Sequence, residues 1–153
     1  PIDVLSQKAR VFLEKADINI QSDAWLNLLV GIFQDRMTHI GEIVSLYQSF
    51  FHQDFQISAE AYQFLVDNHS EVLLEKFADL LLNSTFEADE IEQLIKLAGQ
   101  ETSTKGKPLF MGLRIATTGD MHGPSLPISL ALLGKSKVLS RLKQTIEKLR
   151  GEL

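Results

Sequence analysis

Cysteine is absent from this sequence of 153 residues, as are long apolar runs and a secretory leader. The lack of cysteine excludes disulfides, a thiolate zinc site and a cysteine nucleophile, and it favours a cytoplasmic location. Uncharged stretches such as residues 24–34 and 43–53 are shorter than the roughly 18 apolar residues of a membrane span, so no membrane insertion is expected. The sequence begins Pro1-Ile2-Asp3 without an initiator methionine, and we expect it to be a piece of a longer protein.

The charge is unevenly distributed along the chain. Residues 1–100 contain 6 basic and 16 acidic side chains, whereas residues 101–153 contain 9 basic and 4 acidic ones. Such an asymmetry is typical of a segment that binds a polyanion next to an acidic one. The same lysines and arginines are also expected on the solvated faces of ordinary helices, so charge alone leaves both interpretations open.

Apolar residues recur at three- and four-residue steps through most of the chain, which is the pattern of amphipathic helices. No stretch alternates with the period of two that marks a strand, so the sequence predicts an all-α fold without a sheet. In the second expected helix, Gly31 or Gly41 is expected to mark a break. The expected helices span residues 4–16, 22–51, 58–65, 70–81, 85–98, 107–116, 126–133 and 135–149.

Residues 105–134 differ from the rest of the chain. An apolar run with the single embedded Arg114 follows Pro108, which suits the first turn of a helix because its missing N–H costs nothing there. Two glycines and a proline between Gly119 and Pro124 then end this helix. We therefore expect two helices that flank a rigid loop with exposed backbone.

This segment carries a family resemblance. The chain resembles the C-terminal part of bacterial-type glutamyl-tRNA synthetases, class I glutamate-tRNA ligases, in the runs KGKPLFMGLRIATTG (105–119), HGP (122–124) and LALLGK (130–135). The resemblance implies an anticodon-binding region built as two small helical cages. Residues 1–54 resemble the C-terminal part of the first cage, incomplete at its N-terminus, and residues 55–153 resemble the second.

The resemblance also implies partners and cofactors. In the family, a catalytic domain that uses ATP and Mg lies N-terminal to this region and carries out the glutamylation. The present chain is therefore expected to hold no cofactor or metal and to be inactive alone. Its expected partners are the anticodon loop of glutamate tRNA and that catalytic domain.

Two arginines are placed on the anticodon by the resemblance. Arg36 falls where the family carries the arginine that reads the third anticodon base and helps separate glutamate tRNA from glutamine tRNA, and the planar guanidinium fork suits that task. Arg114 occupies the position of the family's second base-contacting arginine. Without the resemblance, Arg36 is interpreted as a solvated residue paired with Asp35 or another acid, and Arg114 as a buried side chain that satisfies loop carbonyls.

Other expected RNA contacts lie on or near the loop. Gly123, Pro124 and Leu126 fall where family members wrap backbone and apolar side chains around the first two anticodon bases. Met111 stands where some members carry a polar base contact; a thioether makes no strong hydrogen bond, so we expect this contact to be lost or replaced by packing on the base face. His122 is expected to stabilise the loop, with base stacking as the alternative.

Catalytic motifs are missing. His39-Ile40-Gly41-Glu42 matches only the first part of the class I ATP signature, and it falls in a helical pattern instead of a strand-to-helix turn. The run GKSK at 134–137 does not replace the family's lysine-serine-lysine loop. The four histidines, at positions 39, 52, 69 and 122, lack the spacing of metal ligands.

Three functions are compared on this basis. The favoured one is an RNA-binding module that reports the identity of the anticodon to an absent catalytic domain. The alternative is a helical protein-interaction domain that keeps the fold without reading RNA, which the acidic first 100 residues would suit. An independent enzyme is disfavoured, because no nucleophile, metal or nucleotide-binding constellation is present.

Overall fold

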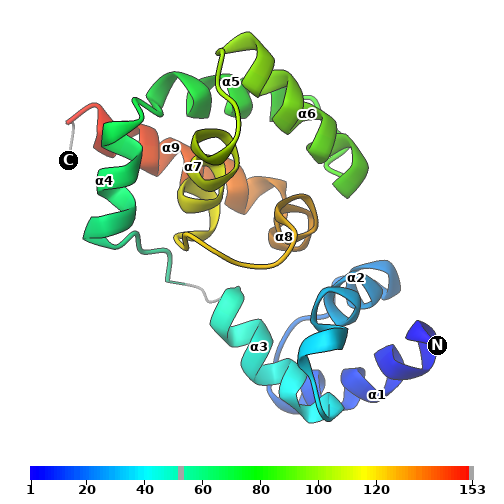
Figure 1. Ribbon diagram of the computed structural model, residues 1–153. Helices are drawn as coiled ribbons and strands as arrows, with labels where there is room; N and C mark the ends of the chain where they lie inside the picture. The colour runs from blue at the N-terminus through cyan, green and yellow to red at the C-terminus, as the bar shows by residue number, and fades with distance from the viewer. Residues whose placement is uncertain (52–53, 152–153) are drawn as a thin grey trace. The chain divides into compact units, whose positions relative to one another are not determined.

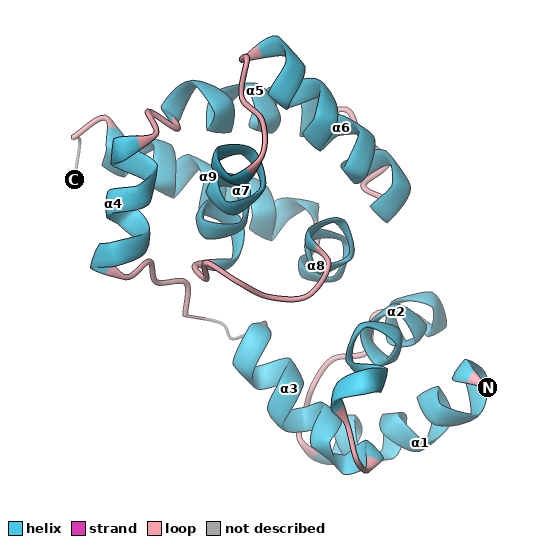
Figure 2. Cartoon of the chain, viewed as in Figure 1, coloured by secondary structure: helices cyan, strands magenta, loops and turns pink. Residues whose placement is uncertain are grey.

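The computed structural model describes residues 1–51 and 54–151, and these residues form nine α-helices and two 3-10 turns without a strand (Figure 1 and Figure 2). The predicted all-α fold class is therefore confirmed. The chain divides into two compact units, residues 1–53 and 54–153. No helix in the described ranges is both long and apolar enough to cross a membrane.

The first unit comprises α1 (Ile2–Lys15), α2 (Asp23–Phe33), the turns η1 (Gln34–Arg36) and η2 (Ile40–Glu42), and α3 (Ile43–Phe50). Helix α2 begins as predicted, because the hydroxyl oxygen of Ser22 accepts a hydrogen bond of 3.0 Å from the N–H of Trp25. Helices α2 and α3 pack on α1. The core of this unit includes the fully buried Leu13, Leu29 and Phe33.

The second predicted helix is interrupted over residues 34–42, so the break falls in the stretch that contains Gly41 and not at Gly31. Gly31 lies inside α2, and Gly41 lies in η2. Between the two turns, Thr38 donates hydrogen bonds to the Glu42 carboxylate from its main-chain N–H at 3.1 Å and from its hydroxyl at 2.6 Å. Such local side-chain bonds compete with helix formation, and hydrophobic spacing does not reveal them.

The second unit comprises α4 (Ala59–Asp67), α5 (Glu71–Leu81), α6 (Ala88–Glu101), α7 (Lys107–Thr118), α8 (Leu126–Leu133) and α9 (Lys135–Leu149). All six agree with the predicted helices to within a few residues at their ends. The largest shifts are at the two ends of α6. At its start, the Glu90 carboxylate accepts a hydrogen bond of 2.6 Å from the N–H of Thr85 and so holds the preceding residues in a turn.

Helix α7 is the central element of the second unit. It contacts each of the other five helices, and Figure 1 shows it surrounded by them. Eight of its twelve residues are buried as a result. The position of α7 therefore fixes the loop that follows it, residues 119–125, which leads into α8.

Candidate nucleic-acid interface

Gly119 ends α7 and begins the loop. Its φ of +84° is the left-handed conformation that favours glycine, and its N–H donates a hydrogen bond of 2.9 Å to the carbonyl of Ile115. A Cβ atom at Gly119 would overlap the main-chain oxygen of Gln56. The loop therefore starts in close contact with the segment before α4, which limits how it can move.

The carboxyl end of α7 is held by α9. Arg141 donates a hydrogen bond from Nη1 to the carbonyl of Thr117 at 2.9 Å, although its side chain is only 4% exposed. The guanidinium also lies over the ring of Phe55, 4.9 Å from the centroid. The hydroxyl of Thr118 donates to the carbonyl of Arg114 at 2.7 Å and accepts from the N–H of Asp120 at 3.2 Å. The bond from Arg141 satisfies one of the carbonyls that the end of a helix leaves open.

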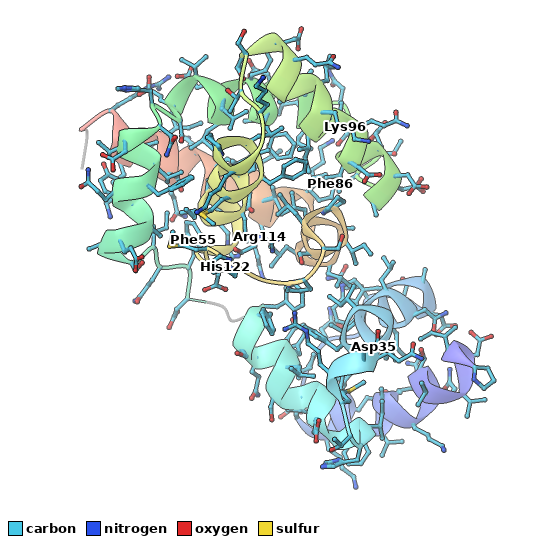
Figure 3. The ribbon with its side chains drawn as sticks, in the orientation of Figure 1. Asp35, Phe55, Phe86, Lys96, Arg114 and His122 are labelled. Atoms are coloured by element: carbon cyan, nitrogen blue, oxygen red, sulfur yellow. The ribbon has the colours of Figure 1, made fainter. Side chains whose placement is uncertain are left out.

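Arg114 lies on α7 close to this loop and is half-buried (Figure 3). Burial lowers the pKa of its guanidinium, and the charge of Asp120 partly offsets that lowering. The same two causes act in the same directions on the pKa of Arg141. Asp120 therefore interacts electrostatically with two arginines, one on α7 and one on α9, and both remain cationic because the ordinary pKa of Arg lies far above neutrality.

The structure places the predicted loop contacts at different depths. Gly123 and Pro124 are half-buried and reach the surface, whereas the side chain of Leu126 is only 3% exposed. Met111 is 8% exposed and lies in a core cluster with residues of α4, among them Leu65. Met111 therefore packs on protein in the structure, and whether it contacts a base stays a prediction.

His122 is exposed on the loop (Figure 3), and it lies among the residues that connect α7 to α8. Its side chain therefore has room to meet a ligand at the surface. Within residues 54–151, this side chain forms neither an ion pair nor a hydrogen bond.

Arg36 belongs to the first unit and ends the turn η1. Its side chain is exposed, and its guanidinium lies over the ring of Phe50, 5.2 Å from the centroid. Within residues 1–51, no carboxylate pairs with it, and Asp35 is exposed beside it. A guanidinium stacked on a ring keeps its in-plane N–H groups available, so Arg36 is held in a preferred direction with its donors open.

The sequence interpretation missed Arg141. It left this residue, like the other basic side chains of residues 101–153, either on a solvated helix face or available to a polyanion, but Arg141 is buried. A signal existed, because Arg141 falls three residues after Val138 and four before Thr145, on the same stripe that buries both. Three other basic residues on α9 are exposed, as the solvated interpretation expects: Lys137, Lys143 and Lys148.

Structural roles account for the two ATP-like runs. Glu42 of the His39 to Glu42 run receives the hydrogen bonds of Thr38 that stabilise a turn, and these bonds lower the pKa of its carboxyl group. The run lies in a 3-10 turn and not in the helix that its pattern predicted. In the run GKSK, the ammonium of Lys135 donates to the carbonyl of Ser84 at 3.0 Å.

No group of three or more potential metal ligands occurs among the described residues. His52, one of the four histidines, lies outside them.

Residues 4–146 match the family model described as an anticodon binding domain. The chain belongs to this family of anticodon-binding domains. The domain is 41% identical over 152 residues to a glutamate-tRNA ligase of Acholeplasma laidlawii, which covers 99% of the chain and 34% of that protein. It is 43% identical over 124 residues to a glutamate-tRNA ligase of Bacillus licheniformis, covering 80% of the chain and 26% of that protein. The anticodon-binding domain thus spans about a third or less of these relatives.

A solved structure shares the fold of the domain. It is the crystal structure of a glutamate tRNA ligase from Elizabethkingia meningosepticum in complex with its amino acid, with a TM-score of 0.83 and 21% identity over 97% of this chain and 29% of that one. The likeness at this identity establishes the fold. The resemblance stated from the sequence is confirmed, and the protein-interaction alternative is not favoured.

Proposed function

We propose that the chain binds the anticodon loop of glutamate tRNA as the C-terminal part of a glutamate-tRNA ligase. In this proposal, a catalytic domain N-terminal to it in a longer protein attaches glutamate with ATP and Mg, in the cytoplasm. Residues 1–54 form the C-terminal part of a first helical cage, and residues 55–153 form a second. The family match and the ligase relatives support the proposal.

The observation that carries the proposal is the state of Arg36. The residue is exposed and stacked on Phe50, and no acid within residues 1–51 neutralises it. A cation held in one direction with open in-plane donors suits two hydrogen bonds to one base edge. We assign to Arg36 the third anticodon base, as in the resemblance.

The second unit supplies the remaining contacts in this proposal. Arg114 donates to a base from its half-buried position on α7, while the backbone of Gly123 and the ring of Pro124 surround the first two bases. Leu126 and Met111 are buried, so they support these contacts from beneath through the packing of α8 and α7. Single-stranded loop bases can be splayed and read at their edges by such a surface.

Specificity follows from differential binding. A site that donates two hydrogen bonds to the correct base leaves those donors unpaired with the wrong one, and the loss penalises the wrong tRNA. The lysines of α9 add attraction for phosphates that does not depend on sequence, and salt weakens it. In this proposal, the chain discriminates between tRNAs by their anticodon, while the attachment of glutamate takes place in another domain.

The test is a titration of the chain with a glutamate-type anticodon stem-loop at low and physiological salt. The same loop with its third anticodon base changed is measured in parallel, and Arg36→Ala is measured with both RNAs. We expect binding that weakens with salt, prefers the parent third base and loses that preference in the variant. Preference unchanged in Arg36→Ala would remove the assignment of Arg36.

Absence of binding at every salt by the folded chain would contradict RNA binding by this chain. A capture experiment that then recovered a protein partner would support the protein-interaction alternative, which the 16 acids of residues 1–100 suit.

A further inference from the structure

One stripe of α7 reaches the surface although the helix is central. Four of its residues escape burial, and three of these, Lys107, Phe110 and Arg114, follow one another at steps of three and four. Residues at these steps lie above one another on a single helix face. We call these three residues the α7 stripe. It consists of an aromatic ring with a cation about one helical turn away on either side.

Phe110 is unusual for an exposed residue. Its side chain is 44% exposed, and within residues 54–151 it is the one exposed side chain among the phenylalanines and tyrosines. Other aromatic rings of this unit are drawn into contacts, as Phe55 is beneath Arg141 and Tyr62 beneath Lys148. Phe110 thus presents ring surface to solvent on a helix that is otherwise buried.

The charges on α7 itself are of one sign, and Asp120 of the following loop interacts with one of them, Arg114. Residues 105–118 contain Lys105, Lys107 and Arg114 and no acidic residue. A ring flanked by cations is suited to a polyanion that also carries flat apolar groups, which is the chemistry of single-stranded RNA. A protein partner would use the same stripe only if it carried acidic side chains on both sides of an apolar one.

We propose that Phe110 is a stacking platform for one unpaired base of the anticodon loop, adjacent to the base that Arg114 contacts. This inference rests on the proposed function and adds to it a residue that selects unpaired bases without reading their edges. Lys107 contacts a phosphate of the same strand. Stacking is tolerant of sequence because every base has a π-face, so Phe110 contributes affinity while Arg114 contributes identity.

The test measures RNA binding by the 153-residue chain with an anticodon stem-loop in which 2-aminopurine replaces, one at a time, each loop base. A 2-aminopurine that stacks on an aromatic ring loses fluorescence, so the wild-type protein is expected to quench the fluorescence at one loop position. We expect Phe110→Ala to weaken binding about 5- to 100-fold and to abolish this quenching even when the protein is saturating. Phe110→Trp restores the affinity to within about threefold and restores the quenching at the same position. Phe110→Leu, which keeps apolar bulk without a ring, behaves as Phe110→Ala.

The contributions of the Lys107 charge and of the Phe110 ring to binding are distinguished by how the affinity for RNA depends on salt concentration. Phe110→Ala keeps the slope of affinity against salt, because no cation is lost, whereas Lys107→Ala lowers that slope by about one phosphate contact. Val72→Ala is the matched control, since Val72 is 63% exposed on α5 and far more accessible than Phe110. It is expected to leave binding unchanged.

The outcomes separate the two proposals. If the wild-type chain binds the stem-loop and Phe110→Ala binds as Val72→Ala does, the stacking platform is wrong and the proposed function stands. If Phe110→Leu restores full affinity and quenching, the ring itself is not used and the inference is overturned. If the wild-type chain binds no RNA at low salt, the proposed function fails, and the stacking platform with it.

Discussion

The guanidinium of Arg141 on α9 donates a hydrogen bond of 2.9 Å to the carbonyl of Thr117 near the end of α7. The two residues are 24 positions apart, and the bond is buried. It joins the last helix of the second unit to the point where the loop 119–125 begins. Because Phe55 covers the other side of the guanidinium at 4.9 Å, the same side chain also fixes the segment before α4.

Replacing Arg141 with Met is expected to destabilise the second unit by about 2–4 kcal/mol, because a buried carbonyl loses its charged donor and Asp120 loses a cation. Urea unfolding followed by circular dichroism measures the change. Lys143→Met on the same helix is the control, since Lys143 is exposed, and it is expected to change the free energy of unfolding by less than about 0.5 kcal/mol. Equal effects of the two substitutions would contradict a structural role for Arg141.

Two glycines of the same helix region are expected to respond with opposite sign to alanine. Gly119→Ala places a Cβ on the oxygen of Gln56 in a left-handed conformation, and we expect a loss of at least about 2 kcal/mol. Gly112→Ala lies inside α7, where the new Cβ meets Ser70 Oγ at 3.7 Å in ordinary contact. It is expected to stabilise by about 0.5–1 kcal/mol because the unfolded chain loses freedom. Thermal unfolding of both variants measures the two changes in stability. A lower stability of Gly112→Ala would show that α7 does not tolerate the methyl group.

Local signals in the sequence predicted most of the fold. Helices α2 and α4 begin at the predicted starts, where Ser22 and Ser58 cap them, and α7 and α8 end at Gly119 and Gly134, within a few residues of the predicted ends. Each of these outcomes depends on a few neighbouring residues. Where side-chain hydrogen bonds decided the backbone, as between Thr38 and Glu42 in the first unit, the hydrophobic spacing predicted the wrong element.

The sequence could name candidate residues for the site, but it could not show how deeply each side chain is buried. The resemblance singled out Arg36 and Arg114. In the structure, the side chain of each residue is at least partly exposed to solvent. Spacing along the chain does not show that Phe50 lies beneath Arg36, or that Gln56 approaches Gly119 across 63 positions. These contacts depend on how helices pack, so they appear only once the elements are assembled.

The stability of the first unit is expected to depend on the ionisation of Glu42. Hydrogen bonds from Thr38 hold the pKa of this carboxyl below its ordinary value in the folded state. The unfolded state therefore binds the proton at higher pH, so the contribution is complete above the ordinary glutamate pKa and is lost as the pH falls through the lowered one. Thermal unfolding from pH 7 to pH 3 measures it. Glu42→Gln is expected to flatten the decline between the two pKa values, and an unchanged profile would show that this carboxyl is not linked to folding.

The contact between Arg36 and Phe50 is expected to set how well the third anticodon base is discriminated. Arg36→Lys keeps the charge but loses the planar fork and its stack on the ring, so overall affinity and its salt dependence stay close to those of the wild type, while discrimination falls by about 1–3 kcal/mol. Phe50→Leu keeps apolar bulk beneath an intact Arg36, and a smaller loss of about 0.5–1 kcal/mol is expected from the missing cation–π contact. Titrations of each variant with the two stem-loops that differ only in the third base give both energies. If Arg36→Lys discriminated as well as the wild type, a simple positive charge would be sufficient at this position and the bidentate reading would be wrong.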